Sequence, residues 1–271
     1  MQSTLLRQQI HNRFPVLRVL APWLMVVIVL LSWELVTRLQ LYPEFIIPRP
    51  ITVFDKFVEV IANGRLWLHA STTLGQMAIG LAIGLSTALT LGYALAKSTL
   101  LEDILSPIIV ALQSTPVVAY APLLVIWFGT GPTSKIVTCA LIVFFPMLLN
   151  TMVGIRSVPS SLRDLMRSLR ASRWQMFWLL EVPAALPVLL GGLKVSATLA
   201  VIGAVVGEFV SANAGLGHLI KISRDAYDTP LVVVAVLTLA IIARTLYGIV
   251  ALLERRLLAW QTRAQRSNVI S

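Results

Sequence analysis

The sequence predicts an all-α integral membrane protein with about six transmembrane helices. Two features of composition support this class: 57% of the 271 residues are apolar and only 13% are charged, and the mean hydropathy is +0.84. Soluble domains carry about a quarter of charged residues. The third observation is that the apolar residues fall in runs of about 20, the length that a helix needs to cross the hydrocarbon of a bilayer.

The apolar runs define six spans, which are expected at residues 19–37, 72–96, 104–128, 136–155, 185–210 and 231–252. The first, second, fourth and sixth are long runs with few helix breakers. The third contains Pro107, Pro116 and Pro122, and the fifth begins at a proline. Because proline has no backbone N–H, neighbouring helices or a polar cavity must satisfy the carbonyl groups that it leaves free.

The net charge of +10 predicts topology and not nucleic-acid binding, because Lys and Arg occur in short segments between the apolar runs. Their distribution predicts that both termini are cytoplasmic. A signal peptide is the competing interpretation of residues 13–37. The run is long for a signal peptide and no small-residue cleavage site follows it, so we expect an uncleaved anchor. Residues 39–71 are then an external connector, with a short helix near 51–62.

The segment between the fourth and fifth spans is predicted to form a basic amphipathic helix over residues 160–177. Ser161 and Asp164 have the spacing of a capping box after Pro159. Leucines at 162, 165 and 169 share one face, and arginines at 163, 167 and 170 share another,. Two interpretations fit: an interfacial helix held by anionic lipid headgroups, or a docking helix for a soluble partner.

The sequence DLMRSLRASRWQMFWLLEVPAALPVLLGGLKV resembles the EAA loop of bacterial ABC importer permeases, the cytoplasmic loop on which a separate ATPase docks. The family pattern is Glu-Ala-Ala, three residues, Gly, and a later Leu-Pro pair. Asp164 takes the acidic position, Leu165 and Met166 replace the alanines, Arg170 replaces the glycine, and the Leu-Pro pair lies at 186–187. The resemblance implies an ATPase-coupling set of Asp164, Arg167, Ser168, Arg170, Ala171, Ser172 and Trp174.

Further segments resemble the same family: LQSTPVVAYAPLLVIWFGTGPTSKI from Leu112, FFPMLLNT from Phe144, GAVVGEFVSANAGLGHLI from Gly203 and YDTP from Tyr227. They are similar to the permease branch for nitrate, alkanesulfonate and taurine, and most similar to its relatives for thiamine-pyrimidine precursors and riboflavin. The resemblance implies the type I ABC importer permease fold over residues 70–254. Residues 1–69 then hold the N-terminal tail, first helix and connector, and residues 255–271 a cytoplasmic basic tail.

The implied function is ATP-driven import of a small heterocyclic vitamin or vitamin precursor across the bacterial inner membrane. The implied partners are an ABC ATPase dimer, an external solute-binding protein, a second permease chain and membrane lipid. ATP would be used by the ATPase, so this chain is expected to be no enzyme and to bind no cofactor. The alternatives are import of alkanesulfonate, taurine or nitrate, and a secondary transporter that acts without an ATPase.

Polar and aromatic residues in the spans are candidates for the substrate path. Gln113 and Thr115 precede Pro116, where a locally opened helix would expose carbonyl groups. Tyr120 and Trp127 lie seven residues apart, on nearly one helical face, where they could stack on a flat heterocycle. Asn150 is the candidate in the fourth span. The alternatives are packing between helices or anchoring at the interface for the aromatic residues, and an interhelical hydrogen bond for the amide.

Several other residues carry structural expectations. Glu208 is an acid in an apolar run and is expected to have a structural partner, with contact to the substrate as the alternative. Gly215 and Gly217 are expected to form a turn. The pair at 80 and 84 is assigned to packing within the chain, and the pair at 203 and 207 to contact with a second chain. The three histidines are not at metal-ligand spacing, and GTGPTSK at 129–135 lacks the second glycine of a phosphate loop, so no metal or ATP site is expected.

Overall fold

The computed structural model describes residues 15–259, and all regular structure in that part of the chain is helical. The order of elements is α2 Pro15–Arg38, α3 Pro50–Ala62, α4 Arg65–Lys97, α5 Thr99–Ser114, the 3-10 helix η1 Val117–Tyr120, α6 Ala121–Phe128, α7 Pro132–Arg156, α8 Ser160–Ser168, α9 Arg173–Met176, the π-helix η2 Phe177–Glu181, α10 Val182–Val210, α11 Leu216–Asp225 and α12 Thr229–Leu257. The predicted basic tails at 1–14 and 260–271 lie outside the described residues.

A helix occupies each of the six predicted spans. Four helical runs are long and apolar enough to cross a membrane: α4, α7, the run Arg173–Val210, and α12. The bent pair of α5 with η1 and α6 makes a fifth candidate, and the 24-residue α2 covers the first predicted span. The all-α class is therefore confirmed, although α4 begins at Arg65 and not at residue 72. The expected short helix of the connector is α3.

The third span over 104–128 is broken before Pro116, where the sequence predicted a locally opened helix, but the bend is much sharper than a local opening. The helices on the two sides of the break, Thr99–Ser114 and Val117–Phe128, meet at 86°. Thr115 has an extended backbone, with φ −88° and ψ 129°. The reason is Pro116, whose ring clashes with a helical conformation of the residue before it. Pro107 stays inside α5, and Pro122 lies at the start of α6, where a missing N–H costs nothing,.

Helix α7 lies between α4 and α10, which approach it closely through glycines. A Cβ atom on Gly80 would lie 2.6 Å from the Cβ of Cys139, and one on Gly203 would lie 2.7 Å from the Cα of that same cysteine. A Cβ on Gly207 would lie 2.9 Å from the Cα of Lys135. The first glycine pair therefore packs within the chain, as predicted. The assignment of the second pair to a second chain is wrong, because α7 already covers that face of α10.

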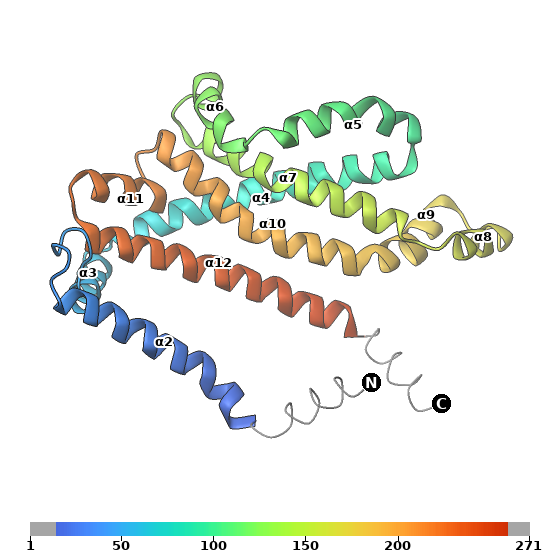
Figure 1. Ribbon diagram of the computed structural model, residues 1–271. Coiled ribbons are helices and arrows are strands. Elements are labelled where there is room, and N and C mark those ends of the chain that lie inside the picture. The colour runs from blue at the N-terminus through green and yellow to red at the C-terminus, as the bar shows by residue number, and fades with distance from the viewer. Residues whose placement is uncertain (1–14, 260–271) are drawn as a thin grey trace.

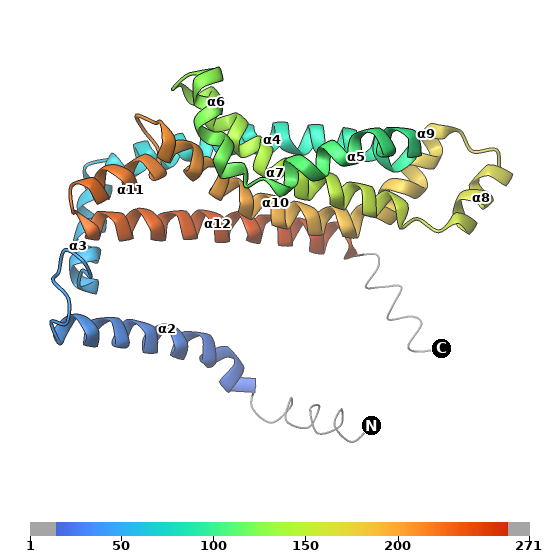
Figure 2. The same ribbon diagram turned by 45° about the horizontal axis from the view of Figure 1, so that its top comes forward.

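The two ends of the bundle carry different elements (Figure 1). Helices α3 and α11 lie at one end, and α8 and α9 project from the other. Lys56 of α3 bridges Glu59, at 2.9 Å, and Asp228 at the start of α12, at 3.5 Å. The hydrogen bond to Glu59 is the main cause that raises the pKa of Lys56. Helix α2 contacts the rest mainly through α3 and stands apart from the bundle in both views (Figure 2).

The predicted continuous helix over 160–177 is also wrong, because the chain turns between α8 and α9. Arg170 has φ +53°, a left-handed conformation that favours glycine. Its N–H donates to Arg167 O at 2.9 Å, and the N–H of Ala171 donates to Met166 O at 3.0 Å. This is the Schellman pattern that closes a helix. Arg170 stands at the family's glycine position, so the turn explains why glycine is used there.

The predicted capping box of Ser161 and Asp164 is not formed, because α8 begins two residues earlier than that box requires, with Pro159 as its N-cap. A capping box occurs instead at α9. The N–H of Gln175 donates to the Oγ of Ser172 at 3.2 Å, and the N–H of Ser172 donates to the Oε1 of Gln175 at 2.8 Å. Capping makes Ser172 the residue that restarts the helix after the turn.

The close packing predicts unequal effects of two Gly→Ala changes on α4. A Cβ on Gly84 would lie 2.7 Å from the backbone oxygen of Ala140, whereas a Cβ on Gly75 meets nothing within 4 Å. Gly84→Ala should therefore lower the free energy of unfolding by about 1–3 kcal/mol. Gly75→Ala should leave it unchanged or raise it, since alanine favours helices. Thermal unfolding of the detergent-solubilised variants measures both, and equal melting temperatures would contradict the close α4–α7 contact.

The left-handed turn predicts that Arg170→Gly stabilises the α8–α9 segment by about 1 kcal/mol, because glycine adopts positive φ without a Cβ clash. Arg170→Val should loosen the segment, since β-branched residues tolerate this conformation least. Hydrogen exchange of the peptide 160–176 measures both effects. Faster exchange in Arg170→Gly than in the parent protein would show that the arginine side chain, and not the backbone turn, holds this segment.

Candidate functional site

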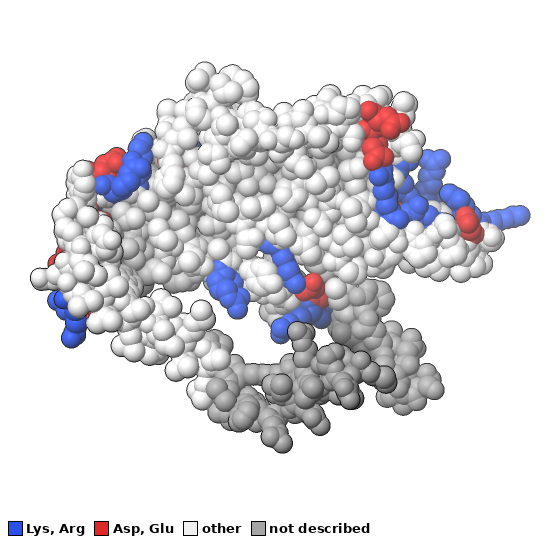
Figure 3. All heavy atoms as spheres, viewed as in Figure 1, with Lys and Arg blue, Asp and Glu red and all other residues white. Residues whose placement is uncertain are grey.

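The α8–α9 surface consists of Asp164, Leu165, Arg167, Leu169 and Trp174. Leu165 is 54% exposed, and Leu169 and Trp174 are each 69% exposed. Asp164 and Arg167 form an exposed ion pair of 3.1 Å. Figure 3 shows Lys and Arg side chains gathered at this end of the visible face. Large exposed apolar side chains beside charged ones on a projecting segment are typical of a surface that contacts a protein or a membrane.

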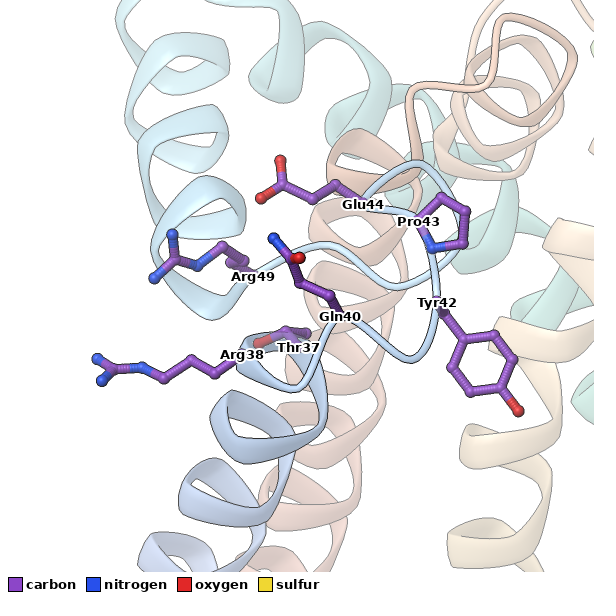
Figure 4. A pocket seen from close by; sticks show the side chains of 7 residues that line it. All are labelled: Thr37, Arg38, Gln40, Tyr42, Pro43, Glu44 and Arg49. Carbon is purple, nitrogen blue, oxygen red and sulfur yellow. The ribbon is translucent and has the colours of Figure 1, made fainter.

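A cavity of about 420 Å³ lies at the opposite end, beside the connector (Figure 4). Its two arginines, Arg38 and Arg49, are both paired with Glu34, at 2.7 and 3.5 Å. In Figure 4 the ring of Tyr42 points away from both of them. The residues of this cavity come from one short stretch of chain, Thr37, Arg38, Gln40, Tyr42, Pro43, Glu44 and Arg49. Nothing from the bundle converges on it, so it is a weaker candidate site than the α8–α9 surface.

A second cavity, of about 710 Å³, lies behind the α8–α9 surface and is lined by Tyr93, Lys97, Arg167, Ala171, Arg173, Met176 and Glu181. Of the predicted coupling residues, Arg167 and Ala171 line it. The hydroxyl of Ser168 donates a hydrogen bond to Asp164 O at 3.0 Å, which is a contact within α8. The predicted coupling residues therefore lie on one continuous segment, and they include the turn at Arg170 and the cap at Ser172.

The buried end of this cavity holds a carboxylate that sequence reasoning missed. Glu181, in η2, is 1% exposed. It pairs with Lys97 at the end of α4, and the hydroxyl of Tyr93 donates to it at 3.0 Å. Lys97 also lies 5.5 Å from the centre of the Tyr93 ring. We call these three residues the Glu181 clamp. An acid within the apolar run WLLEVPAAL was the signal, since such a charge needs a partner.

An aromatic cluster continues from the α8–α9 surface to the same place. Trp174 stacks on Phe177 with ring centres 6.1 Å apart, and Phe177 meets Tyr93 edge-on at 5.2 Å. Trp178 packs against Trp174 at 5.5 Å. The exposed indole of Trp174 is thus two ring contacts away from α4. Packed rings and the Glu181 clamp therefore connect α9 to α4, and the chain itself connects α9 to α10 through η2.

Two arginines form hydrogen bonds between the ends of α8, α7 and α5. Arg163 of α8 donates to Ile155 O of α7 at 2.6 Å, and Arg156 of α7 donates to Glu102 of α5 at 2.7 Å. The α8–α9 segment is therefore attached to α4 and α7 by side chains and to α10 by the chain.

The predicted substrate-path residues are not gathered in one cavity. Gln113 is exposed on α5, and Thr115 lies at the break. Tyr120 ends η1, and Trp127, on α6, is 68% exposed. Asn150 donates to Pro146 O of its own helix at 2.8 Å, and a Cβ on Gly192 of α10 would touch it. The first four lie along the broken span, whereas Asn150 lies in the α7–α10 contact.

Glu208, at the α3–α11 end, has the structural partner that was predicted. It is fully buried, accepts a hydrogen bond from the Thr73 hydroxyl at 2.7 Å and accepts another from the N–H of Gly217 at 2.6 Å. Gly215 forms the predicted turn with φ +121°, and a Cβ there would lie 2.2 Å from the Glu208 carboxyl carbon. The prediction of a turn at Gly217 is wrong, because this residue lies inside α11, where a Cβ would lie 2.9 Å from the Cβ of Glu208. The carboxylate holds the α10–α11 turn onto α4.

The part of the chain that the structure describes contains no group of three or more His, Cys, Asp or Glu residues that could hold a metal ion. The candidate functional features of the described residues are the α8–α9 surface, the Glu181 clamp behind it and the broken span. A docking surface joined by fixed contacts to membrane helices can convert the movement of a partner into movement of those helices.

Comparison with known proteins identifies the family of this chain. Residues 80–259 match the family model of the binding-protein-dependent transport system inner membrane component. The riboflavin transport system permease protein RibX of Chloroflexus aurantiacus is 46% identical over 86% of this chain and 87% of its own length. The formylaminopyrimidine transport permease protein ThiX of Halalkalibacterium halodurans is 32% identical over 89% and 96%. The taurine transport system permease protein TauC of Escherichia coli is 31% identical over 97% and 100%.

Among solved structures, a chain of an amino acid ABC transporter superposes with a TM-score of 0.59, covering 74% of this chain and 98% of its own, at 18% identity. That likeness shows the fold. The sequence matches show the family, since the family model alone covers residues 80–259. The chain therefore belongs to the binding-protein-dependent transport system inner membrane components, the multi-pass permease subunits of ABC importers.

Proposed function

We propose that this permease imports a small heterocyclic vitamin or vitamin precursor, riboflavin or a thiamine-pyrimidine precursor. The observation that carries the proposal is the 46% identity with a riboflavin permease over most of both chains, together with the 32% identity with a formylaminopyrimidine permease. A sulfonate or taurine is the second candidate, because a taurine permease is 31% identical over nearly the whole chain. A secondary transporter without an ATPase is a distant third.

We further propose how the chain is assembled. An ATPase partner follows from the family, and ATP hydrolysis belongs to that separate subunit. Two copies of this chain would form the pore, and an external solute-binding protein would deliver the solute. The α8–α9 end would face the cytoplasm, because arginines are concentrated there,. The α3–α11 end, with the connector, would then face outward, and both termini would be cytoplasmic.

In the proposed mechanism, the two ATPase subunits close on ATP and draw the two α8–α9 surfaces together. The aromatic cluster and the Glu181 clamp pass this movement to α4, and η2 passes it to α10. The solute cavity then opens outward, and it returns inward after hydrolysis. A ligand shifts such an equilibrium only by its difference in affinity between the two states. The exposed apolar residues of the α8–α9 surface provide the contact area through which the ATPase would bind the two states with different affinities.

The test is to reconstitute the chain with its ATPase and binding protein in proteoliposomes. ATP-dependent uptake of riboflavin, a thiamine-pyrimidine precursor and taurine is then measured side by side. We expect saturable uptake of one vitamin compound. Uptake of taurine alone would move the protein to the second candidate, and equal uptake without ATP would reject the pump.

Docking predicts that Asp164→Lys abolishes ATP-dependent uptake, because it reverses the charge of an exposed residue of the α8–α9 surface and breaks the pair with Arg167. Asp164 is 67% exposed, so the variant should insert and fold normally. Asp103→Lys is the matched control, an equal charge change at an exposed residue of α5. Co-purification of the ATPase and uptake are measured for both. Normal uptake by Asp164→Lys would reject the docking assignment.

The Glu181 clamp predicts a different defect for Lys97→Met, in which the ATPase still binds but transport falls. Methionine fills the space and leaves the carboxylate of Glu181 buried with one hydrogen bond, at a cost of about 1–3 kcal/mol. Lys97→Arg, which keeps the charge, should retain most activity. The ratio of solute transported to ATP hydrolysed measures coupling. A normal ratio in Lys97→Met would show that force reaches the membrane helices by another route.

A further inference from the structure

A small cavity at the α3–α11 end has no assigned role. It has a volume of about 280 Å³ and is bounded by α4, by the start of α7 and by the α10–α11 turn. Its lining includes Thr72 and Gln76 of α4, Lys135 of α7, and Ala212, Asn213 and Ala214 of the turn. Three segments that are far apart in the sequence thus meet at one opening. In the orientation proposed above, this cavity lies at the external end of the permease, which we call its outer mouth.

The first unusual residue of the cavity is Gln76. Its side chain is more than nine-tenths buried, since the residue is 9% exposed. Its Oε1 atom is buried and has no hydrogen-bond partner. Such an atom is costly, and buried polar groups of native proteins are almost always paired. A leucine of similar size would avoid that cost. A ligand that enters the cavity and pairs with the amide would remove it.

The second unusual residue is Lys135, which is 1% exposed although it carries an ammonium group. Its Nζ donates to Thr130 O at 2.5 Å and to Gly131 O at 3.0 Å. Within the described residues no carboxylate lies close enough to form an ion pair with it. Glu208 acts on this ammonium electrostatically without forming an ion pair. An ammonium group has three N–H bonds, so one remains for a further acceptor. The lining of the cavity therefore includes an unpaired amide oxygen and an ammonium group with one unused N–H.

We propose that Gln76 and Lys135 form a reception site at the outer mouth, which binds the edge of a planar heterocycle that carries a donor beside an acceptor. A ring N–H next to a carbonyl group, or an amino group next to a ring nitrogen, fits the carboxamide in either of its two orientations. A neighbouring carbonyl oxygen then accepts from the ammonium of Lys135. A sulfonate only accepts hydrogen bonds, so it leaves the amide oxygen without a partner.

The reception site rests on the proposed function, because it specifies which part of the imported solute the permease recognises. Flavins carry an N–H between two carbonyl groups, and aminopyrimidines carry an amino group beside a ring nitrogen. Both solute classes proposed above therefore have the required edge. The nearby Glu208 network fixes the α10–α11 turn, so the third wall of the cavity is held in place before a solute arrives.

The test combines a change in the protein with a change in the solute. Uptake of riboflavin and of N3-methylriboflavin, which lacks the N–H donor, is measured for the parent complex and for Gln76→Leu, with the same saturated binding protein. We expect Gln76→Leu to slow riboflavin uptake about tenfold, the effect of losing one or two neutral hydrogen bonds. It should not slow N3-methylriboflavin further, because the contact is already absent. Ser86→Leu, on an exposed part of α4, is the control.

A second measurement separates binding from folding. Without solute, Gln76→Leu should melt at a higher temperature than the parent chain, since it removes an unpaired buried polar atom. If riboflavin is imported but both flavins are slowed equally by Gln76→Leu, or neither is, the reception site is wrong while the proposed function stands. If taurine is imported and neither vitamin class is, the reception site and the proposed solute fail together.

Discussion

The rest of this structure depends on how closely α4 and α10 approach α7. Lipid offers no hydrophobic force between helices, so contact depends on fit. Cys139 of α7 faces Gly80 on one side and Gly203 on the other, with no room for a Cβ on either. This close fit makes α4, α7 and α10 the packed core of the bundle. The elements at both ends are placed by that core, because each is continuous in the chain with one of its helices.

At the α8–α9 end, this core supports the α8–α9 surface. The surface is short and exposed, and it makes few apolar contacts of its own. Glu181 and Phe177 connect it to Tyr93 of α4, and the chain connects it to α10. The α8–α9 surface is thus attached to two of the three core helices, which the proposed transmission of movement requires.

At the other end, polar groups are buried where apolar ones would be more stable. Glu208 is fully satisfied by Thr73 and Gly217, which fits a structural role. Gln76 is not satisfied, and Lys135 keeps one donor free. An unpaired amide oxygen at Gln76 and an unused N–H at Lys135, beside the well-paired carboxylate of Glu208, lower stability without need. Such a site is expected to serve a function other than stability. The broken third span, with Gln113 and Thr115 beside Pro116, is a second irregular region in the membrane.

Apolar run length and motif spacing are local properties of the chain, so they were sufficient to predict the all-α class, the approximate positions of the spans, the short connector helix and the family. They also predicted that Glu208 needs a structural partner. That Gly203 and Gly207 face α7 follows from the fold alone, since a glycine pattern does not say which helix it meets. The fold likewise decided the turn at Arg170 and the 86° break. Backbone angles at such points, and the partners of Glu181, arise from contacts between residues far apart in the chain.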